Sequence, residues 1–141
     1  MYMVQIELNR VDDGIAFDAT DVNGHSIKMD GAVDNGGNNS GVRPMQALLM
    51  ALGGCSGIDV VSILKKQRQE ITDFKMSIEG ERETGKEPAL WKYIHITFKL
   101  KGNIDADKAN KACALSMDKY CSVAATLRAA GCTIEWKAIV E

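Results

Sequence analysis

The longest apolar stretch of the chain, residues 43–70, predicts one long helix. Pro44 suits the first turn of a helix, where its missing N–H costs nothing, and the charged run that begins at Lys65 marks the other end. Nearly every side chain at positions 47–64 is apolar or small, so these side chains do not keep to one stripe. Because a helix that is apolar all round must be covered on all sides, we expect a core helix that a second copy of the chain helps to cover.

Short alternating runs before this helix predict an antiparallel meander. Turn signals separate the runs, at Gly14 after two aspartates and at the Asn23-Gly24 pair. A segment rich in glycine and asparagine, residues 31–41, has the composition of a flexible loop beside the start of the helix. The predicted strands are residues 2–8, 15–19 and 25–29.

After the long helix, two alternating runs predict a long hairpin. They cover residues 74–83 and 91–101, and a polar turn at 84–88 joins them. The second run places its aliphatic side chains on one face, which we expect to point into the core. These side chains are Ile94, Ile96, Phe98 and Leu100.

Two helices and a strand are predicted for the remainder. Asp105 is a candidate cap for a helix over residues 106–117, and a break follows at 118–120. Cys121 opens a shorter helix that stops at Gly131, and residues 132–140 form a last strand. This order predicts an α+β fold with helices on one face of a largely antiparallel sheet. We find no repeat or linker, so we expect a single domain over residues 1–141.

Composition and charge narrow the classes of function. The 141 residues are 45% hydrophobic and 26% charged, and a net charge of −2 gives no basic footprint for nucleic acid. Residues 45–64 are about as long as a bilayer span, but Asp59 and three glycines interrupt them, so we expect no membrane partner. The first residues lack a basic segment followed by an apolar one, which predicts no secretory signal and a cytoplasmic location.

The sequence contains four cysteines, which are the candidates for chemistry. No CxxC pair is present and neither histidine is near a cysteine in the sequence, so we expect no zinc site and no other cofactor. Cys121 lies at the start of a predicted helix, where the helix dipole can lower the pKa of a thiol. The alternative is that all four are small buried hydrophobic residues, as most free cysteines are. Those cysteines are Cys55, Cys113, Cys121 and Cys132.

Two motifs carry a resemblance to a known family. RPMQALLMALGGCSGIDVVSIL, followed later by SMDKYCSVAATL, resembles the OsmC/Ohr family, the osmotically inducible protein C and organic hydroperoxide resistance proteins, in its OsmC-like branch. The resemblance implies an intertwined homodimer, in which antiparallel sheets wrap around a long central helix and the site lies at the subunit interface. It also implies a thiol peroxidase that reduces organic hydroperoxides.

Individual site residues follow from the same resemblance. Cys55 takes the position of the peroxidatic cysteine and Cys121 that of the resolving cysteine. The chemistry suits a thiol pair, because the sulfenic acid formed by a peroxide is captured by a nearby thiol before it is oxidised further. A dithiol, such as a lipoyl group, is the implied reductant. Cys113 and Cys132 have no such role and are interpreted as core residues.

Other positions depart from the family pattern. Met45, followed by Gln46, stands where the peroxidases have a glutamate, and Lys28 stands where they have an arginine. A lysine supplies charge without the planar fork of arginine, and a methionine cannot orient that fork. Arg43 is a candidate replacement; the alternative is a solvated residue ahead of the helix.

Asp59 completes the candidate residues. It lies one helical turn beyond Cys55 and either faces the same cavity or accepts hydrogen bonds from a helix end or a partner subunit. The glycines around Cys55 are interpreted as packing residues. We expect a peroxidase of oxidative or osmotic stress defence, weakened by the departures at Met45 and Lys28. The alternative is a non-catalytic, stress-related protein that binds a small molecule on the same scaffold.

Overall fold

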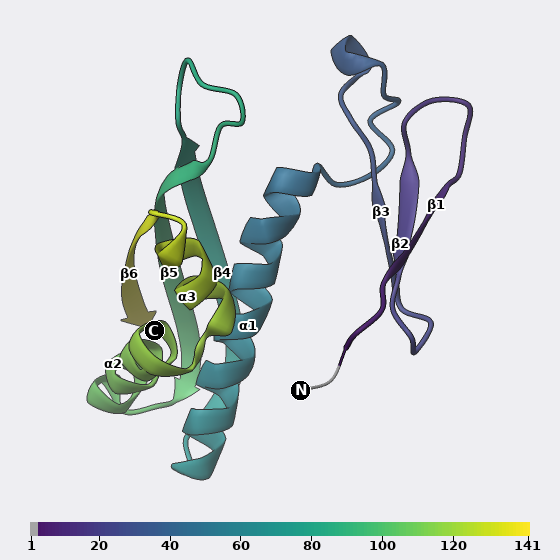
Figure 1. Ribbon diagram of the computed structural model, residues 1–141. Coiled ribbons are helices and arrows are strands. Elements are labelled where there is room, and N and C mark those ends of the chain that lie inside the picture. Colours follow the sequence, from purple (N-terminus) through teal and green to yellow (C-terminus); the bar gives the residue numbers. More distant parts are fainter. Residues whose placement is uncertain (1–2) are drawn as a thin grey trace. The chain divides into compact units, whose positions relative to one another are not determined.

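The computed structural model describes residues 3–141, and this part of the chain divides into two compact units, the first ending at Leu48 and the second beginning at Leu49. It contains two three-stranded sheets, with strand orders β1-β2-β3 and β4-β5-β6 (Figure 1). The predicted α+β class is confirmed, and the single domain over residues 1–141 stays a prediction. In chain order the elements are β1 (Glu7–Arg10), β2 (Phe17–Thr20), β3 (Ser26–Met29), the 3-10 turn η1 (Val33–Asn35), α1 (Pro44–Lys66), β4 (Glu70–Arg82), β5 (Trp91–Asn103), α2 (Ala106–Leu115), the π-helical segment η2 (Ser116–Tyr120), α3 (Ser122–Ala129) and β6 (Thr133–Val140).

The first unit contains the predicted antiparallel meander, with shorter strands than the alternating pattern gives. The first strand begins at Glu7 rather than at residue 2, which lies outside the described residues. Pairing sets these limits, because Glu7 lies opposite Thr20 and Arg10 opposite Phe17, so β1 is only as long as the part of β2 that faces it. An alternating pattern cannot show where the partner strand stops.

One carboxylate organises the loop between β3 and α1. Asp30 is only 3% exposed, and it accepts hydrogen bonds from the Ser40 hydroxyl at 2.7 Å and from the backbone N–H of Gly31 and of Asn38. The Ser40 hydroxyl, more than any other group, holds the pKa of Asp30 below its usual range. The glycine-rich segment is therefore closed around a buried charge, and η1 forms one turn within it.

The long helix is confirmed, and it ends at Lys66, within the charged run that marks its predicted end, before the last residues of the 43–70 stretch. Arg68 adopts a left-handed backbone with φ of 59°, and Gln69 N–H donates back to the Leu64 carbonyl, so the chain turns out of the helix before Glu70 starts β4. Within the described residues α1 has the length and mean hydropathy, 1.9, of a membrane span, and 33% of that window is buried.

A buried stripe along α1 packs against β4. A Cβ atom placed on Gly57 would lie 2.7 Å from Met76 Cε, and one on Gly53 would lie 2.9 Å from Ile78 Cδ1. Gly53 and Gly57 therefore let the sheet approach the helix backbone, which agrees with their interpretation as packing residues. The buried residues of the helix are Leu52, Gly53, Ser56, Gly57, Val60 and Leu64.

The second sheet combines the predicted hairpin with a parallel strand. β4 and β5 pair antiparallel, and the aliphatic face predicted for β5, from Ile94 to Leu100, is fully buried. β6 pairs parallel to β5, with Ile94 opposite Ile134. A parallel neighbour requires a crossover connection, which α2, η2 and α3 supply. Figure 1 shows this crossover as the green to yellow helices α2 and α3, between β5 and β6 in the chain.

The observed structure of the crossover agrees with the sequence prediction at both ends and differs from it in the middle. The Asp105 side chain caps α2 by accepting from the Lys108 N–H at 3.0 Å, and Gly131 follows α3 with φ of +100°. Between the helices, where the sequence predicts two more helical residues and then a break, η2 continues the coil in π-helical form. The coil thus continues from α2 to Cys121, which directly precedes α3.

Candidate functional site

Cys55, Asp59 and Cys121 come together in the second unit. The two Sγ atoms and a carboxylate oxygen of Asp59 all lie within 4.8 Å of one another. Cys55 and Asp59 share one face of α1 because they are four residues apart on a helix. Cys121 enters from the crossover, directly before α3. We refer to these three residues as the thiol–carboxylate cluster.

The two cysteines differ in how far solvent can reach them. Cys55 is half-buried, at the margin of the stripe that α1 presents to β4, whereas Cys121 is only 3% exposed. A backbone hydrogen bond also fixes the position of Cys121, since its N–H donates to the Ser116 carbonyl at 2.8 Å. A reagent from solution therefore meets the Cys55 thiol first, and Cys121 lies behind it.

The backbone around Cys121 has the geometry of a helix cap. Its φ of −74° and ψ of 102° are extended, and its Sγ accepts a hydrogen bond from the Ala124 N–H at 3.4 Å. This arrangement places a sulfur where serine or aspartate commonly caps a helix. The hydrogen bond fixes the direction of the Cys121 sulfur.

Burial controls the acidity of Cys121. It raises the pKa of the thiol to about 11, and the neighbouring Cys55 thiol acts in the same direction. The Ala124 N–H favours the thiolate but is outweighed. The prediction that the start of the helix lowers this pKa is therefore wrong in its net sign, because removal from water costs the anion more than the N–H groups of Ala124 and Val123 restore.

Asp59 is fixed by a residue that the sequence analysis missed. The Ser116 hydroxyl, which is fully buried, donates to Asp59 Oδ2 at 2.8 Å. Both alternatives for Asp59 thus hold in part, since it faces the thiols and also accepts a hydrogen bond from the segment at the end of α2. The two residues are 57 positions apart, so no local pattern identifies Ser116 as its partner.

The other cysteines lie apart from this chemistry. Cys113 is fully buried, and burial raises the pKa of its thiol to about 12. Cys132 is 5% exposed, and burial raises the pKa of its thiol as well. Both have the environment of core residues, as the sequence predicts.

The supporting residues predicted from the resemblance belong to the first unit or to the helix start that is part of it. Lys28 lies on β3 and is exposed. Arg43 is half-buried, and its guanidinium donates to the Gly41 carbonyl at 3.0 Å and to Asn39 Oδ1 at 2.8 Å. Met45 and Gln46 occupy the first turn of α1. Arg43 therefore stabilises the loop ahead of the helix, and a role for these residues beside the thiols stays a prediction.

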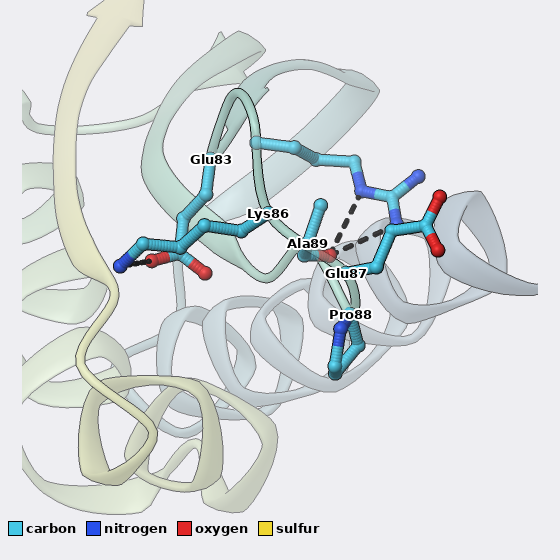
Figure 2. A pocket seen from close by; sticks show the side chains of 6 residues that line it. Glu83, Lys86, Glu87, Pro88 and Ala89 are labelled. Atoms are coloured by element: carbon cyan, nitrogen blue, oxygen red, sulfur yellow. Dashed lines mark hydrogen bonds and ion pairs between the residues drawn. The ribbon is translucent and has the colours of Figure 1, made fainter.

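Two surface hollows, lined by residues outside the thiol–carboxylate cluster, differ in polarity. One of about 740 Å³ lies at the turn between β4 and β5, where Arg82 donates to the Ala89 carbonyl at 2.9 Å and Lys86 pairs with Glu83 at 3.3 Å (Figure 2). Arg82 thus binds the backbone of the turn, and Lys86 and Glu83 bind each other. Another, of about 370 Å³, lies in the first unit and is mainly apolar. Neither of these two hollows is lined by a cysteine.

Comparison with known proteins identifies the scaffold. The family model described as OsmC-like protein matches residues 36–137. The chain belongs to the OsmC-like protein family. Protein YhfA of Escherichia coli (strain K12) is 42% identical over 119 residues, which cover 84% of this chain and 85% of YhfA. The family named from the sequence motifs is confirmed, and membership supports a stress-related redox protein.

Solved structures extend the likeness over the whole OsmC-like chain. A hypothetical protein from Aquifex aeolicus VF5 is 32% identical, with a TM-score of 0.82 over 100% of this chain and 99% of that one. A protein from Legionella pneumophila named as an organic hydroperoxide resistance protein OsmC is 13% identical, with a TM-score of 0.69 over 100% and 98% of the two chains. The second likeness concerns the fold alone, and the OsmC-like fold predicted from the sequence is confirmed.

Proposed function

We propose that this OsmC-like protein is a thiol peroxidase that reduces organic hydroperoxides in the defence against oxidative or osmotic stress. The observation that carries the proposal is the approach of Cys55 Sγ and Cys121 Sγ to within 4.8 Å, with Cys55 the more accessible of the two. Membership of the OsmC-like family supports the redox theme. We further propose a cytoplasmic homodimer, in which a second copy covers the apolar side chains that α1 leaves exposed, such as Ile58 at 70%.

The first step is an attack of the Cys55 thiolate on the outer oxygen of the hydroperoxide. The new S–O bond forms as the O–O bond breaks, and the organic alkoxide leaves as an alcohol after it takes up a proton. Cys55 becomes a sulfenic acid, so its sulfur is oxidised by two electrons and the peroxide is reduced by two. The half-buried position of Cys55 lets a small apolar hydroperoxide reach the sulfur.

The second step joins the sulfurs. The Cys121 sulfur attacks the Cys55 sulfenic sulfur, an S–S bond forms, and the hydroxyl leaves as water with the proton of the Cys121 thiol. The pKa of Cys121, about 11, keeps this thiol protonated and unreactive toward peroxide at neutral pH, which fits the resolving role. Asp59, held by Ser116, lies where a carboxylate can take up that proton and pass it to the leaving hydroxyl. A dithiol such as a lipoyl group then returns the disulfide to two thiols.

The departures at Met45 and Lys28 reduce the rate in this proposal. Removal of one positioned electrostatic group from an active site costs on the order of 10² to 10³ in rate. Met45 cannot act as a carboxylate, and Lys28 offers a point charge in place of a guanidinium. We therefore expect weak but measurable turnover, raised by the double change Met45→Glu with Lys28→Arg.

Stopped-flow oxidation of the reduced protein by cumene and tert-butyl hydroperoxide tests the proposal. We expect two free thiols to be lost per chain, no oxidation in Cys55→Ser, and a trapped sulfenic acid in Cys121→Ser. Cys132→Ala is the matched control, because it removes a buried cysteine outside the cluster and should keep the full reaction. Retention of both thiols at high peroxide would contradict the proposal, as would a dominant disulfide that contains Cys132.

One observation favours the alternative of a small-molecule-binding protein without catalysis. The hollow of about 370 Å³ in the first unit is lined by apolar side chains, among them Leu8, Ile15, Phe17 and Met29. A cavity of this size and character can hold a small apolar ligand. A thiol pair inert to both hydroperoxides, together with saturable binding of an apolar dye that Phe17→Asp abolishes, would favour this alternative over the peroxidase.

A further inference from the structure

We propose that the reduced thiol–carboxylate cluster is also a binding site for a thiophilic divalent cation of the Zn²⁺ class. The ligands are Cys55 Sγ, Cys121 Sγ and one carboxylate oxygen of Asp59, which all lie within 4.8 Å of one another. This activity goes beyond the proposed peroxidase and does not depend on it, because it needs the two thiols and the carboxylate but no peroxide chemistry.

The distances suit a small ion with tetrahedral geometry. With Zn–S near 2.3 Å and Zn–O near 2.1 Å, ligand atoms around one ion lie roughly 3.6 to 3.8 Å apart. The cluster, whose atoms lie within 4.8 Å of one another, reaches that spacing when each side chain moves by about an ångström or less. Three protein ligands leave the fourth position for water or another ligand, which is the arrangement of an open site.

The surroundings hold the ligands in place before an ion arrives. The Ser116 hydroxyl donates to Asp59 Oδ2 at 2.8 Å and so orients the carboxylate. The Ala124 N–H directs Cys121 Sγ at 3.4 Å. Hydrogen bonds of this kind to ligand atoms are a regular feature of protein metal sites, where their loss typically lowers metal affinity by about 10-fold to 100-fold.

Charge and ligand type decide which cations fit. Binding converts two thiols into thiolates and releases two protons to solvent, so two thiolates and one carboxylate face a dication. Sulfur ligands favour Zn²⁺, Cd²⁺ and Co²⁺ over Mg²⁺ and Ca²⁺, which bind through oxygen. The sequence predicts no zinc site because its cysteines lack close spacing, whereas here the fold joins residues from α1 and from the crossover.

Metal binding and disulfide formation exclude each other at this site. Both use the same two sulfur atoms, and a sulfur that is bonded to its partner has no thiolate to offer a cation. An occupied site therefore protects Cys55 from hydroperoxides, and an oxidised site releases its metal. Oxidation of the two thiols therefore depends on whether a thiophilic metal is bound, and metal binding depends on whether the thiols are reduced.

Titration of the reduced, metal-free protein with Co²⁺ under anaerobic conditions tests the site directly. We expect one Co²⁺ per chain, a thiolate-to-cobalt charge-transfer band, tetrahedral d–d bands, and loss of all three when Zn²⁺ is added. Cys55→Ser and Cys121→Ser should abolish the charge-transfer band, and Asp59→Asn should weaken binding at least tenfold. Ser116→Ala should weaken it by about 10-fold to 100-fold.

Matched controls separate this site from other cysteines and carboxylates. Cys132→Ala and Asp107→Asn, which change a buried thiol outside the cluster and an exposed carboxylate on α2, should leave Co²⁺ affinity unchanged. The same band in Cys121→Ser, or no band in the natural protein, would overturn the proposal. The titration contains no peroxide, so its failure leaves the peroxidase intact, and an inert thiol pair in the hydroperoxide assay leaves the metal site intact.

Discussion

The hydrogen bond between Ser116 and Asp59 leads to a prediction about stability. Ser116→Ala removes the hydroxyl that donates to Asp59 Oδ2 at 2.8 Å, at a position that is fully buried. Hydrogen bonds to charged groups contribute about 1.5–3 kcal/mol, so we expect the free energy of unfolding to fall by about that amount. For a chain of 141 residues each kcal/mol lowers Tm by roughly 2–4 °C.

Ser56→Ala is the matched control for this prediction. Ser56 is also fully buried, but its hydroxyl donates to the Leu52 carbonyl of its own helix at 2.8 Å, and that acceptor is uncharged. We expect its replacement to cost no more than about 1 kcal/mol. Urea unfolding of the two reduced variants at neutral pH, each fitted with a free slope, gives the comparison.

A double-mutant cycle isolates the pair itself. Ser116→Ala, Asp59→Asn and the combined variant should give a coupling energy of about 1 kcal/mol or more, because the two side chains are in direct contact. A Ser116→Ala cost equal to that of Ser56→Ala, together with no coupling to Asp59, would refute the reasoning. It would mean that burial of the hydroxyl, and not the carboxylate that receives it, determines the energy at this position.

Other predictions follow from the second unit. Asp105→Ala removes the cap of α2 and should cost about 1 kcal/mol, seen as a lower urea midpoint; an unchanged midpoint would contradict it. Gly80→Ala brings a Cβ to 2.9 Å from the rigid Trp91 ring and should cost about 1–3 kcal/mol in the same assay, and a stabilised variant would show that the ring can move. Because the pKa of Cys121 is raised to about 11, its contribution to stability is complete below the thiol's unfolded pKa and is lost as pH rises toward 11. Stability should therefore fall above about pH 9, and less steeply in Cys121→Ser.

Local rules in the sequence predicted much of the second unit. The alternation in β5 identified the buried face from Ile94 to Leu100, and an aspartate before an apolar segment identified the cap of α2. These signals depend only on periodicity and on neighbours within one turn. The family motifs, in turn, identified the two cysteines that the structure brings together.

Properties set by tertiary contacts could not be predicted in this way. The parallel pairing of β6, the π-helical form of η2 and the hydrogen bond from Ser116 each depend on segments far apart in the chain. The acidity of Cys121 shows the same limit, because its position at a helix start is visible in the sequence whereas its burial is not. The strands of the first unit were predicted too long for a related reason, since a strand ends where its partner ends.

The parallel strand β6 also fixes an order of events during synthesis. β4 and β5 follow one another across a short turn, so their pairing closes only a small loop. β6 can join β5 only after the whole crossover has folded back, and that crossover carries Cys121 to Cys55. Ribosomes release the chain from its N-terminus, so the hairpin is available before the crossover. A nascent chain therefore carries Cys55 without Cys121 beside it until the crossover has folded back onto the hairpin and its helix, and during this interval the Cys55 thiol has no resolving partner.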